Sequence, residues 1–253
     1  DIDPAIVRAS RFFAYFSGKG AIPYGEHEPF STSHENNGKC GFSALAFMLQ
    51  DDRVEESKFF AKMCTASASG RELGHTGAFF NYVWAPLGAA VGGEEAAAAH
   101  FSGISWMLDL NRRWDGGFDY DCLNGEGPNS GSQYNGFRMS TAALLTYALP
   151  HRELYITGKG HDSNRWLSSA DVSEAVAADE YDADTRSDSE LIADLGNWSP
   201  KVRKEAGDEL GTRNIDVLEL KQLNALAGNT SMPSGERAGA CYALGKIGNS
   251  GSA

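Results

Sequence analysis

Apolar residues recur with helical spacing over most of the first 150 residues, and they fall into two kinds of helix. One kind is apolar or small at almost every position, and a helix that is apolar on all sides is buried on all sides. Helices of this kind are predicted at residues 39–50, 77–91 and 138–149. The other kind carries charged side chains on one face, which is typical of a helix half exposed to solvent. These helices are predicted at residues 3–17, 54–68 and 94–113. The pattern predicts an all-α protein.

The most apolar of these segments is 77–91, where Phe79, Phe80, Trp84 and Leu87 surround the helix axis. It is interrupted by Pro86 and is shorter than the roughly 20 residues that a membrane span needs. We therefore interpret it as an inner helix and expect it, together with 138–149, to be nearly inaccessible to solvent. Strand content is expected to be close to nil.

Three times, a half-polar helix is followed by a glycine-rich loop and then by a more apolar helix. The motifs at these loops are NGKCGFSALAF, GHTGAFFNYVW and WDGGFDY. They resemble the α/α-toroid superfamily, which includes terpenoid cyclases and protein prenyltransferases. The resemblance covers residues 1–150 and implies a partial toroid of helical hairpins, with every inner-helix N-terminus at one rim.

The pattern changes after residue 150. Residues 151–186 are polar and acidic and are interpreted as a connector with one short helix at 171–178. In residues 187–250, VRKEAGDELG aligns with ERAGACYALG at a spacing of 34 residues, measured from Arg203 to Arg237. This segment resembles HEAT-type repeats, a resemblance that implies a face for binding a protein partner. The combination of toroid and repeats resembles an uncharacterised bacterial domain family, from which no activity can be carried over.

The composition restricts the classes of partner. The 253 residues carry a formal net charge of −12, which disfavours a surface for nucleic acid or a polybasic membrane patch, because both need positive potential. Insertion into a membrane is not expected either. The chain opens on DIDPAIVRA without an initiator Met. We therefore expect a processed or trimmed chain, which favours an extracytoplasmic location, although the sequence leaves the compartment open.

Polar side chains gather in the loops before the predicted inner helices. At such N-termini the free backbone N–H groups attract anions and polarised ligand oxygens. By residue type, the catalytic candidates are His75, Glu35, Asp119 and Tyr82. The substrate-binding candidates are Tyr24, Glu26, His27, Asn37, Asn81, Tyr120, Asp121 and Arg138.

These residue types suit a neutral or weakly charged glycan, because aromatic rings stack on sugars while amides and carboxylates bind hydroxyl groups. Hydrolysis needs two carboxylates, which Glu26 or Glu35 facing Asp119 or Asp121 could supply. Lyase chemistry on a uronate needs a His or Tyr base and an Asn or Arg that neutralises the sugar carboxylate. Alternatively, His75 only caps its helix.

Metal sites are weaker alternatives. Asp119, Asp121 and Asn124 do not match the spacing of a calcium loop. Zinc bound by Asp119, Cys122 and His75 rests on three scattered ligand types. No cofactor or metal is predicted. The first hypothesis is thus a protein that binds glycans at the rim formed by the inner-helix N-termini. Whether it also cleaves them is left open. The alternative is a non-enzymatic scaffold that binds a protein partner through the HEAT-like segment.

Overall fold

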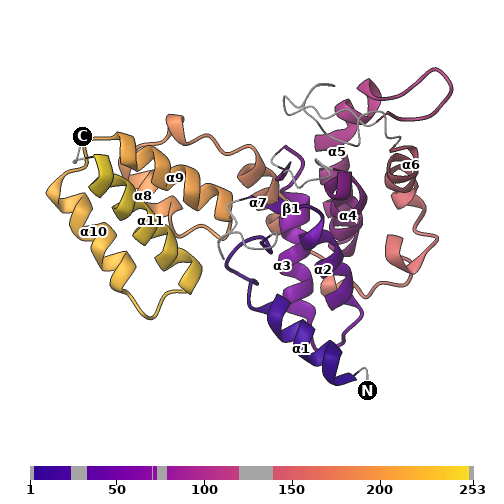
Figure 1. The fold of residues 1–253 in the computed structure, drawn as a ribbon, viewed down its shortest axis with the longest axis horizontal. Coiled ribbons are helices and arrows are strands. Elements are labelled where there is room, and N and C mark those ends of the chain that lie inside the picture. The colour runs from indigo at the N-terminus through magenta and orange to yellow at the C-terminus, as the bar shows by residue number, and fades with distance from the viewer. Residues whose placement is uncertain (1–2, 24–32, 70, 73–78, 120–138, 251–253) are drawn as a thin grey trace. The chain divides into compact units, whose positions relative to one another are not determined.

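The computed structural model describes residues 3–23, 33–69, 71–72, 79–119 and 139–250. They form two compact units, one of residues 1–17 and 21–179, the other of residues 18–20 and 180–253. Each unit is described by itself. Both are built from helices (Figure 1), so the prediction of an all-α protein is confirmed.

The helices of the first unit follow the predicted order. The α-helices are α1 (Asp3–Ala14), α2 (Lys39–Met48), α3 (Val54–Thr65), α4 (Phe79–Val91), α5 (Glu94–Leu110), α6 (Ser140–Ala148) and α7 (Ser169–Asp179). Short 3-10 turns lie at η1 (Leu149–His151), η2 (Tyr155–Thr157) and η3 (Ser163–Arg165). Two strands of two residues each, β1 (Glu35–Asn36) and β2 (Arg71–Glu72), pair in parallel. No larger sheet exists in the described residues, as expected for a helical toroid or any other all-α arrangement.

Glycines set the distance between α2 and α4 in the centre of this unit. A Cβ atom at Gly41 would lie 2.2 Å from the backbone oxygen of Trp84, and one at Gly88 would lie 2.8 Å from the Cα atom of Gly41. Backbone therefore packs against backbone, with no room for a side chain. α3 packs against both helices, and the stacked rings of Phe47 and Phe60, 5.8 Å apart, join α2 to α3.

The burial of individual helices differs from the prediction on α3, on α6 and at the start of α4, where Phe80 is 37% exposed. Every residue from Phe60 to Thr65 on α3 is buried, because this helix packs against α2, α4, α5 and α7 instead of lying at the edge. Conversely, α6 is not inaccessible: Leu144 is 59% exposed, since this helix packs chiefly against α4 and η1. On α4, the prediction holds from Ala85 to Val91, all of which are buried.

The first unit extends beyond the predicted boundary at residue 150. α7 packs against α3 and α5, and the ammonium group of Lys62 on α3 lies 2.9 Å from Asp171 and 2.6 Å from Glu174. At the end of α7, the Asp179 carboxylate accepts hydrogen bonds from the backbone and the hydroxyl of Ser69, at 3.0 and 2.6 Å. These contacts make much of the expected connector part of the first unit.

The second unit consists of η4 (Ala183–Thr185) and the helices α8 (Asp188–Asp194), α9 (Pro200–Thr212), α10 (Val217–Gly228) and α11 (Ser234–Ser250). The two segments that align at a spacing of 34 residues lie in α9 and α11, which pack against each other. Gly207 makes this contact close, because a Cβ there would lie 2.8 Å from the ring of Tyr242. The aligned alanines Ala206 and Ala240 are both fully buried.

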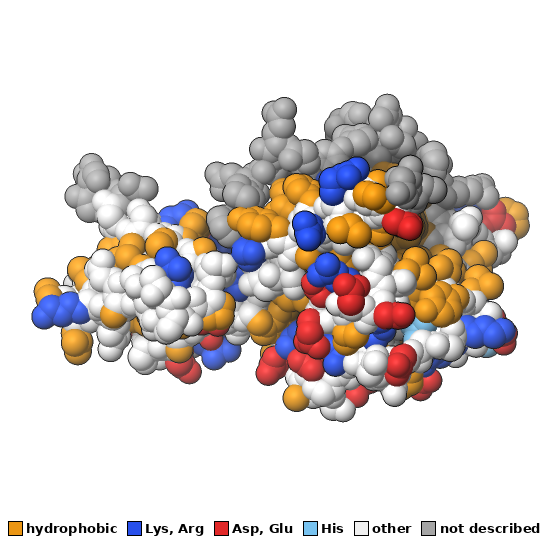
Figure 2. All heavy atoms as spheres, turned by 90° about the horizontal axis from the view of Figure 1, so that it is seen from below, with side chains coloured by type: hydrophobic (Ala, Val, Ile, Leu, Met, Phe, Trp, Pro, Cys, Tyr) orange, Lys and Arg blue, Asp and Glu red, His pale blue; other side chains and the backbone are white. Residues whose placement is uncertain are grey.

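Charges of both signs are interspersed on the face of the molecule drawn in Figure 2. Hydrophobic side chains lie between them in this view. Among the described residues, exposed hydrophobic side chains include Phe12 and Tyr15 of α1, at 61% and 53%. In the described part of the chain, no helix is both long enough and apolar enough to cross a membrane.

Replacing Gly41 with Ala should lower the free energy of unfolding of the first unit by about 1–3 kcal/mol or more, because the added methyl group meets the backbone of α4. Gly245→Ala in α11 is the matched control. Its Cβ meets nothing within 4 Å, so it should stabilise the second unit by about 0.5–1 kcal/mol. Chemical denaturation followed by circular dichroism measures both effects. Wild-type stability of Gly41→Ala would contradict the packing described.

Candidate ligand-binding groove

Glu35, a predicted catalytic carboxylate, is fully buried at the N-terminus of α2. It accepts backbone hydrogen bonds from Asn36 at 2.9 Å, Cys40 at 3.0 Å and Gly41 at 2.9 Å. The thiol of Cys64 on α3 donates a further bond, with 3.6 Å between sulfur and oxygen. The carboxylate therefore supplies acceptors for backbone N–H groups that a helix start leaves without partners. In the described structure this side chain holds α2 in place.

The same burial changes the acidity of the cluster. Burial raises the pKa of Glu35 to about 7, although its four hydrogen bonds act in the opposite direction. Burial, and then the charge of Glu35, raise the pKa values of the Cys40 and Cys64 thiols well above their usual range. Both cysteines are thus held as neutral thiols, which are poor nucleophiles.

Two of the predicted substrate-binding amides lie beside this cluster. Asn37 and Gly38 have positive φ angles of 52° and 81° and form the turn before α2. The side-chain oxygen of Asn81 accepts the backbone N–H of Gly38 at 2.6 Å, which ties α4 to this turn. Asn37 and Asn81 are both buried, and the bond to Gly38 places Asn81 beside the turn that contains Asn37.

The remaining described candidates lie elsewhere in the first unit. Tyr82 is 6% exposed and belongs to an apolar cluster that includes Met107 and Phe118. Asp119 is paired with Arg113, whose Nη1 lies 2.9 Å from a carboxylate oxygen. Asp119 is thus held by an ion pair within its own loop, and the expected pairing of Asp119 with Glu35 stays a prediction. Outside the described residues lie His75, Tyr24, Glu26, His27, Tyr120, Asp121 and Arg138.

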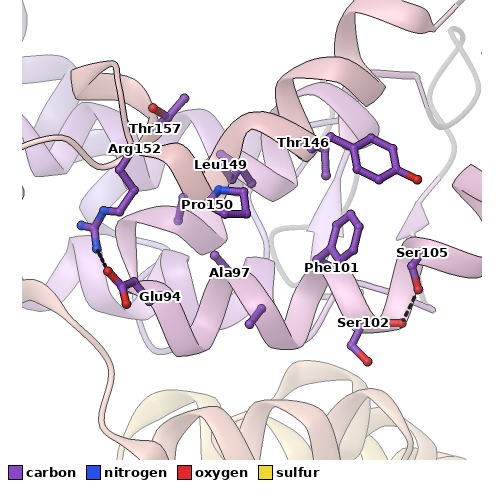
Figure 3. Close-up of a pocket in the computed structure, with 14 residues that line it drawn as sticks. Glu94, Ala97, Phe101, Ser102, Ser105, Thr146, Leu149, Pro150, Arg152 and Thr157 are labelled. Carbon is purple, nitrogen blue, oxygen red and sulfur yellow. Dashed lines mark hydrogen bonds and ion pairs between the residues drawn. The ribbon is translucent and has the colours of Figure 1, made fainter. Parts of the chain in front are cut away.

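A groove of about 810 Å³ lies between α5 and the segment that runs from α6 through η1 to η2 (Figure 3). This volume falls within the range of about 300–1,000 Å³ that is usual for small-molecule sites. Small residues of α5, Ala97 and Ala98, line it together with the ring of Phe101. The ring centre of Phe101 lies 5.3 Å from that of Tyr147 on α6, in an edge-to-face arrangement.

The two ends of the groove are polar. Ser102 and Ser105 lie at one end, and Glu94 and Arg152 lie at the other (Figure 3). Arg152 Nη1 is 2.9 Å from Glu94 Oε1. The groove can thus hold a ligand with an apolar face between two polar ends. In the residues that the structure describes, no group of three or more metal-ligating side chains could hold a metal ion.

Sequence reasoning missed the groove. Residues 94–113 were interpreted as an outer helix with one solvated face, and the four consecutive alanines 96–99 contributed only to its helical pattern. Of these alanines, Ala97 and Ala98 line the groove, and their small side chains leave space beside Phe101 that a larger residue would fill. This run was the one available signal. For Arg152 the sequence offers no such signal, because this residue follows the end of a helix and matches no motif.

A family model described as a domain of unknown function, DUF6288, matches residues 1–158. This is more than half of the chain. The protein belongs to the DUF6288 family. The match covers both walls of the groove and Arg152, but it covers neither α7 nor residues 180–253 of the second unit. The family description names no activity. It agrees with the expectation of an uncharacterised family and leaves the toroid and HEAT resemblances as predictions. No curated protein and no solved structure matches the chain.

The stability of the first unit should depend on pH through Glu35. Because its pKa is raised from 4.5 to about 7, the stabilising contribution is complete below pH 4.5 and is lost as the pH rises through 7. The loss should be about 3 kcal/mol, at about 1.4 kcal/mol per pKa unit. Glu35→Gln should abolish this dependence, since the amide does not titrate.

Urea denaturation between pH 5 and 8 measures the effect. Glu55→Gln, a change of the same type at an exposed position of α3, serves as the control and should keep the wild-type dependence. A Glu35→Gln variant with the wild-type slope would show that this carboxyl does not titrate in the folded state.

Proposed function

We propose that the protein binds glycans in the groove between α5 and α6. The observation that carries the proposal is the lining of this groove, which combines the aromatic side chains of Phe101 and Tyr147 with hydroxyl groups at one end. A sugar ring has an apolar C–H face and a polar rim of hydroxyl groups. Such a ring could lie against the apolar lining while its hydroxyl groups bond Ser102 or Ser105.

We propose binding without cleavage in this groove. Hydrolysis requires two carboxyl groups on either side of the scissile bond, and Glu94 is the one carboxylate among the described residues that line the groove. Cleavage at the predicted rim, with His75 as the central residue, stays a separate hypothesis. Of its catalytic candidates, Glu35 and Tyr82 are buried and serve packing in the described structure.

Filling the groove tests the proposal. Ala98 lines it and is exposed, so Ala98→Leu should leave the fold intact while the larger side chain occupies the place of a sugar ring. Binding should weaken about tenfold or more, which is about 1.4 kcal/mol. Titration calorimetry against a panel of neutral and acidic oligosaccharides gives the affinities.

Ala9→Leu is the matched control, because Ala9 is exposed on α1 and does not line the groove. It should bind as the wild type does. If no oligosaccharide of the panel binds the wild type, or if both variants bind equally well, the groove is not a glycan site.

The second candidate is a scaffold that binds a protein partner through the second unit. One observation favours it: Val217 and Leu218, at the start of α10, are 70% and 64% exposed. Two adjacent exposed aliphatic side chains at the start of a helix are suited to an apolar contact with a protein partner. The toroid and HEAT assignments would fit this candidate as well.

Changing both residues to Ser should remove that contact with little effect on folding, because the side chains are already in water. A partner that the full chain captures from an extract should then be lost from the double variant and retained by Leu154→Ser, a control at an exposed position of the first unit. Equal capture by all three proteins would exclude this surface as the binding face.

A further inference from the structure

We propose that the Arg152 end of the groove binds the carboxylate of an acidic sugar, so that the ligand is a glycan containing uronic acid. This inference rests on the proposed function and narrows it to one class of ligand. Five residues carry it: Arg152, Glu94, Gly93, Gly158 and Trp166.

Contacts other than its ion pair hold the guanidinium of Arg152 in place. Its Nε and Nη2 donate hydrogen bonds to the carbonyl oxygen of Gly158 at 3.2 and 2.8 Å. Its Cζ atom lies 4.9 Å from the ring centre of Trp166. The backbone of Arg152 has a φ angle of 48°, an uncommon value for a residue other than glycine. The surrounding structure therefore fixes both the backbone and the side chain of this residue.

Two glycines make this arrangement possible. A Cβ atom at Gly158 would lie 2.9 Å from Arg152 Nε, and one at Gly93 would lie 2.9 Å from the ring of Trp166. Both glycines have φ angles near 100° (108° and 100°), a region that side chains disfavour. The local sequence thus leaves space for the guanidinium and for the indole on which it stacks.

The remaining nitrogen, Nη1, is directed at the carboxylate of Glu94, which lines the same end of the groove (Figure 3), and this partner is easily exchanged. Glu94 contacts it at 2.9 Å, but the Glu94 side chain is 73% exposed, whereas that of Arg152 is 20% exposed. An ion pair with so exposed a partner contributes little to stability. The carboxylate of Glu94 can rotate into water while Arg152 stays on Gly158 and Trp166. Glu94 thus marks the position that a ligand carboxylate would take.

The chemistry fits a carboxylate better than a hydroxyl group. Charge-assisted hydrogen bonds from a guanidinium to a carboxylate are about twice as strong as those between neutral groups. The overall charge of −12 opposes an acidic ligand at long range, but salt screens this repulsion beyond about 8 Å at physiological ionic strength. At this end of the groove, the charge that acts most directly on a bound carboxylate is then that of Arg152.

The test compares two probes that differ in one feature. Trigalacturonic acid carries carboxylates, and its methyl ester has the same sugar rings without the charge. Titration calorimetry on the full chain should give an affinity about tenfold higher for the acid. Glu94→Gln should raise the affinity for the acid severalfold, because it removes the competing carboxylate, and should leave the ester unchanged.

Arg152→Gln should abolish the preference for the acid. Lys159→Gln is the matched control, since it removes the same charge from a neighbouring exposed position that does not line the groove; it should keep the preference. Circular dichroism checks that each variant is folded, and Glu94→Gln decides the question if Arg152→Gln is not, because Glu94 is mostly exposed.

The outcomes separate the two proposals. Equal binding of acid and ester by the wild type and by Glu94→Gln would overturn carboxylate recognition and leave glycan binding standing. A preference for the acid that persists in a folded Arg152→Gln variant would also overturn it, since the recognising group would lie elsewhere. Binding of neither probe to the wild type or to Glu94→Gln would overturn both proposals for this class of sugar.

Discussion

The contact between α2 and α4 is the constraint on which the first unit depends. Gly41 and Gly88 bring the two backbones together, and this approach fixes where the turn before α2 must lie. The turn at Asn37 and Gly38 is then bonded to Asn81 of α4, and the carboxylate of Glu35 receives the N–H groups at the start of α2. Residues whose polarity suggests chemistry are used here to satisfy backbone groups, because a buried helix start has no water to bond.

Packing around this centre is uneven, and the groove is a consequence. α3 is covered by four helices, whereas α6 packs chiefly against α4 and η1. On the side of α6 that faces α5, Ala97 and Ala98 of α5 are too small to fill the space between the two helices. A ligand-sized groove therefore arises where a large residue is missing, next to a unit that is otherwise closely packed. The end that contains Arg152 is built by residues distant in the sequence, from Gly93 to Trp166.

The fold class could be predicted from the sequence because apolar periodicity is a local property. Helices such as 77–91 and 94–113 bury their apolar faces wherever they are placed, and the observed α4 and α5 lie within those ranges. The degree of burial was less predictable. Leu144 is exposed and Phe60 is buried, because burial depends on how many neighbours a helix receives, and this is set by the tertiary arrangement.

The sequence by itself determined the helices, the net negative charge and the similarity of two segments 34 residues apart, since each follows from residues close together, from composition or from a comparison along the chain. Only the tertiary structure decided the roles of the polar residues. Glu35 was predicted as a catalyst by type, but three backbone N–H groups and a thiol surround it. Arg152 attracted no attention as a type, but a carbonyl oxygen and an indole ring hold it at the end of a groove. A side chain's chemistry depends on its burial and partners, and these come from segments that the sequence keeps far apart.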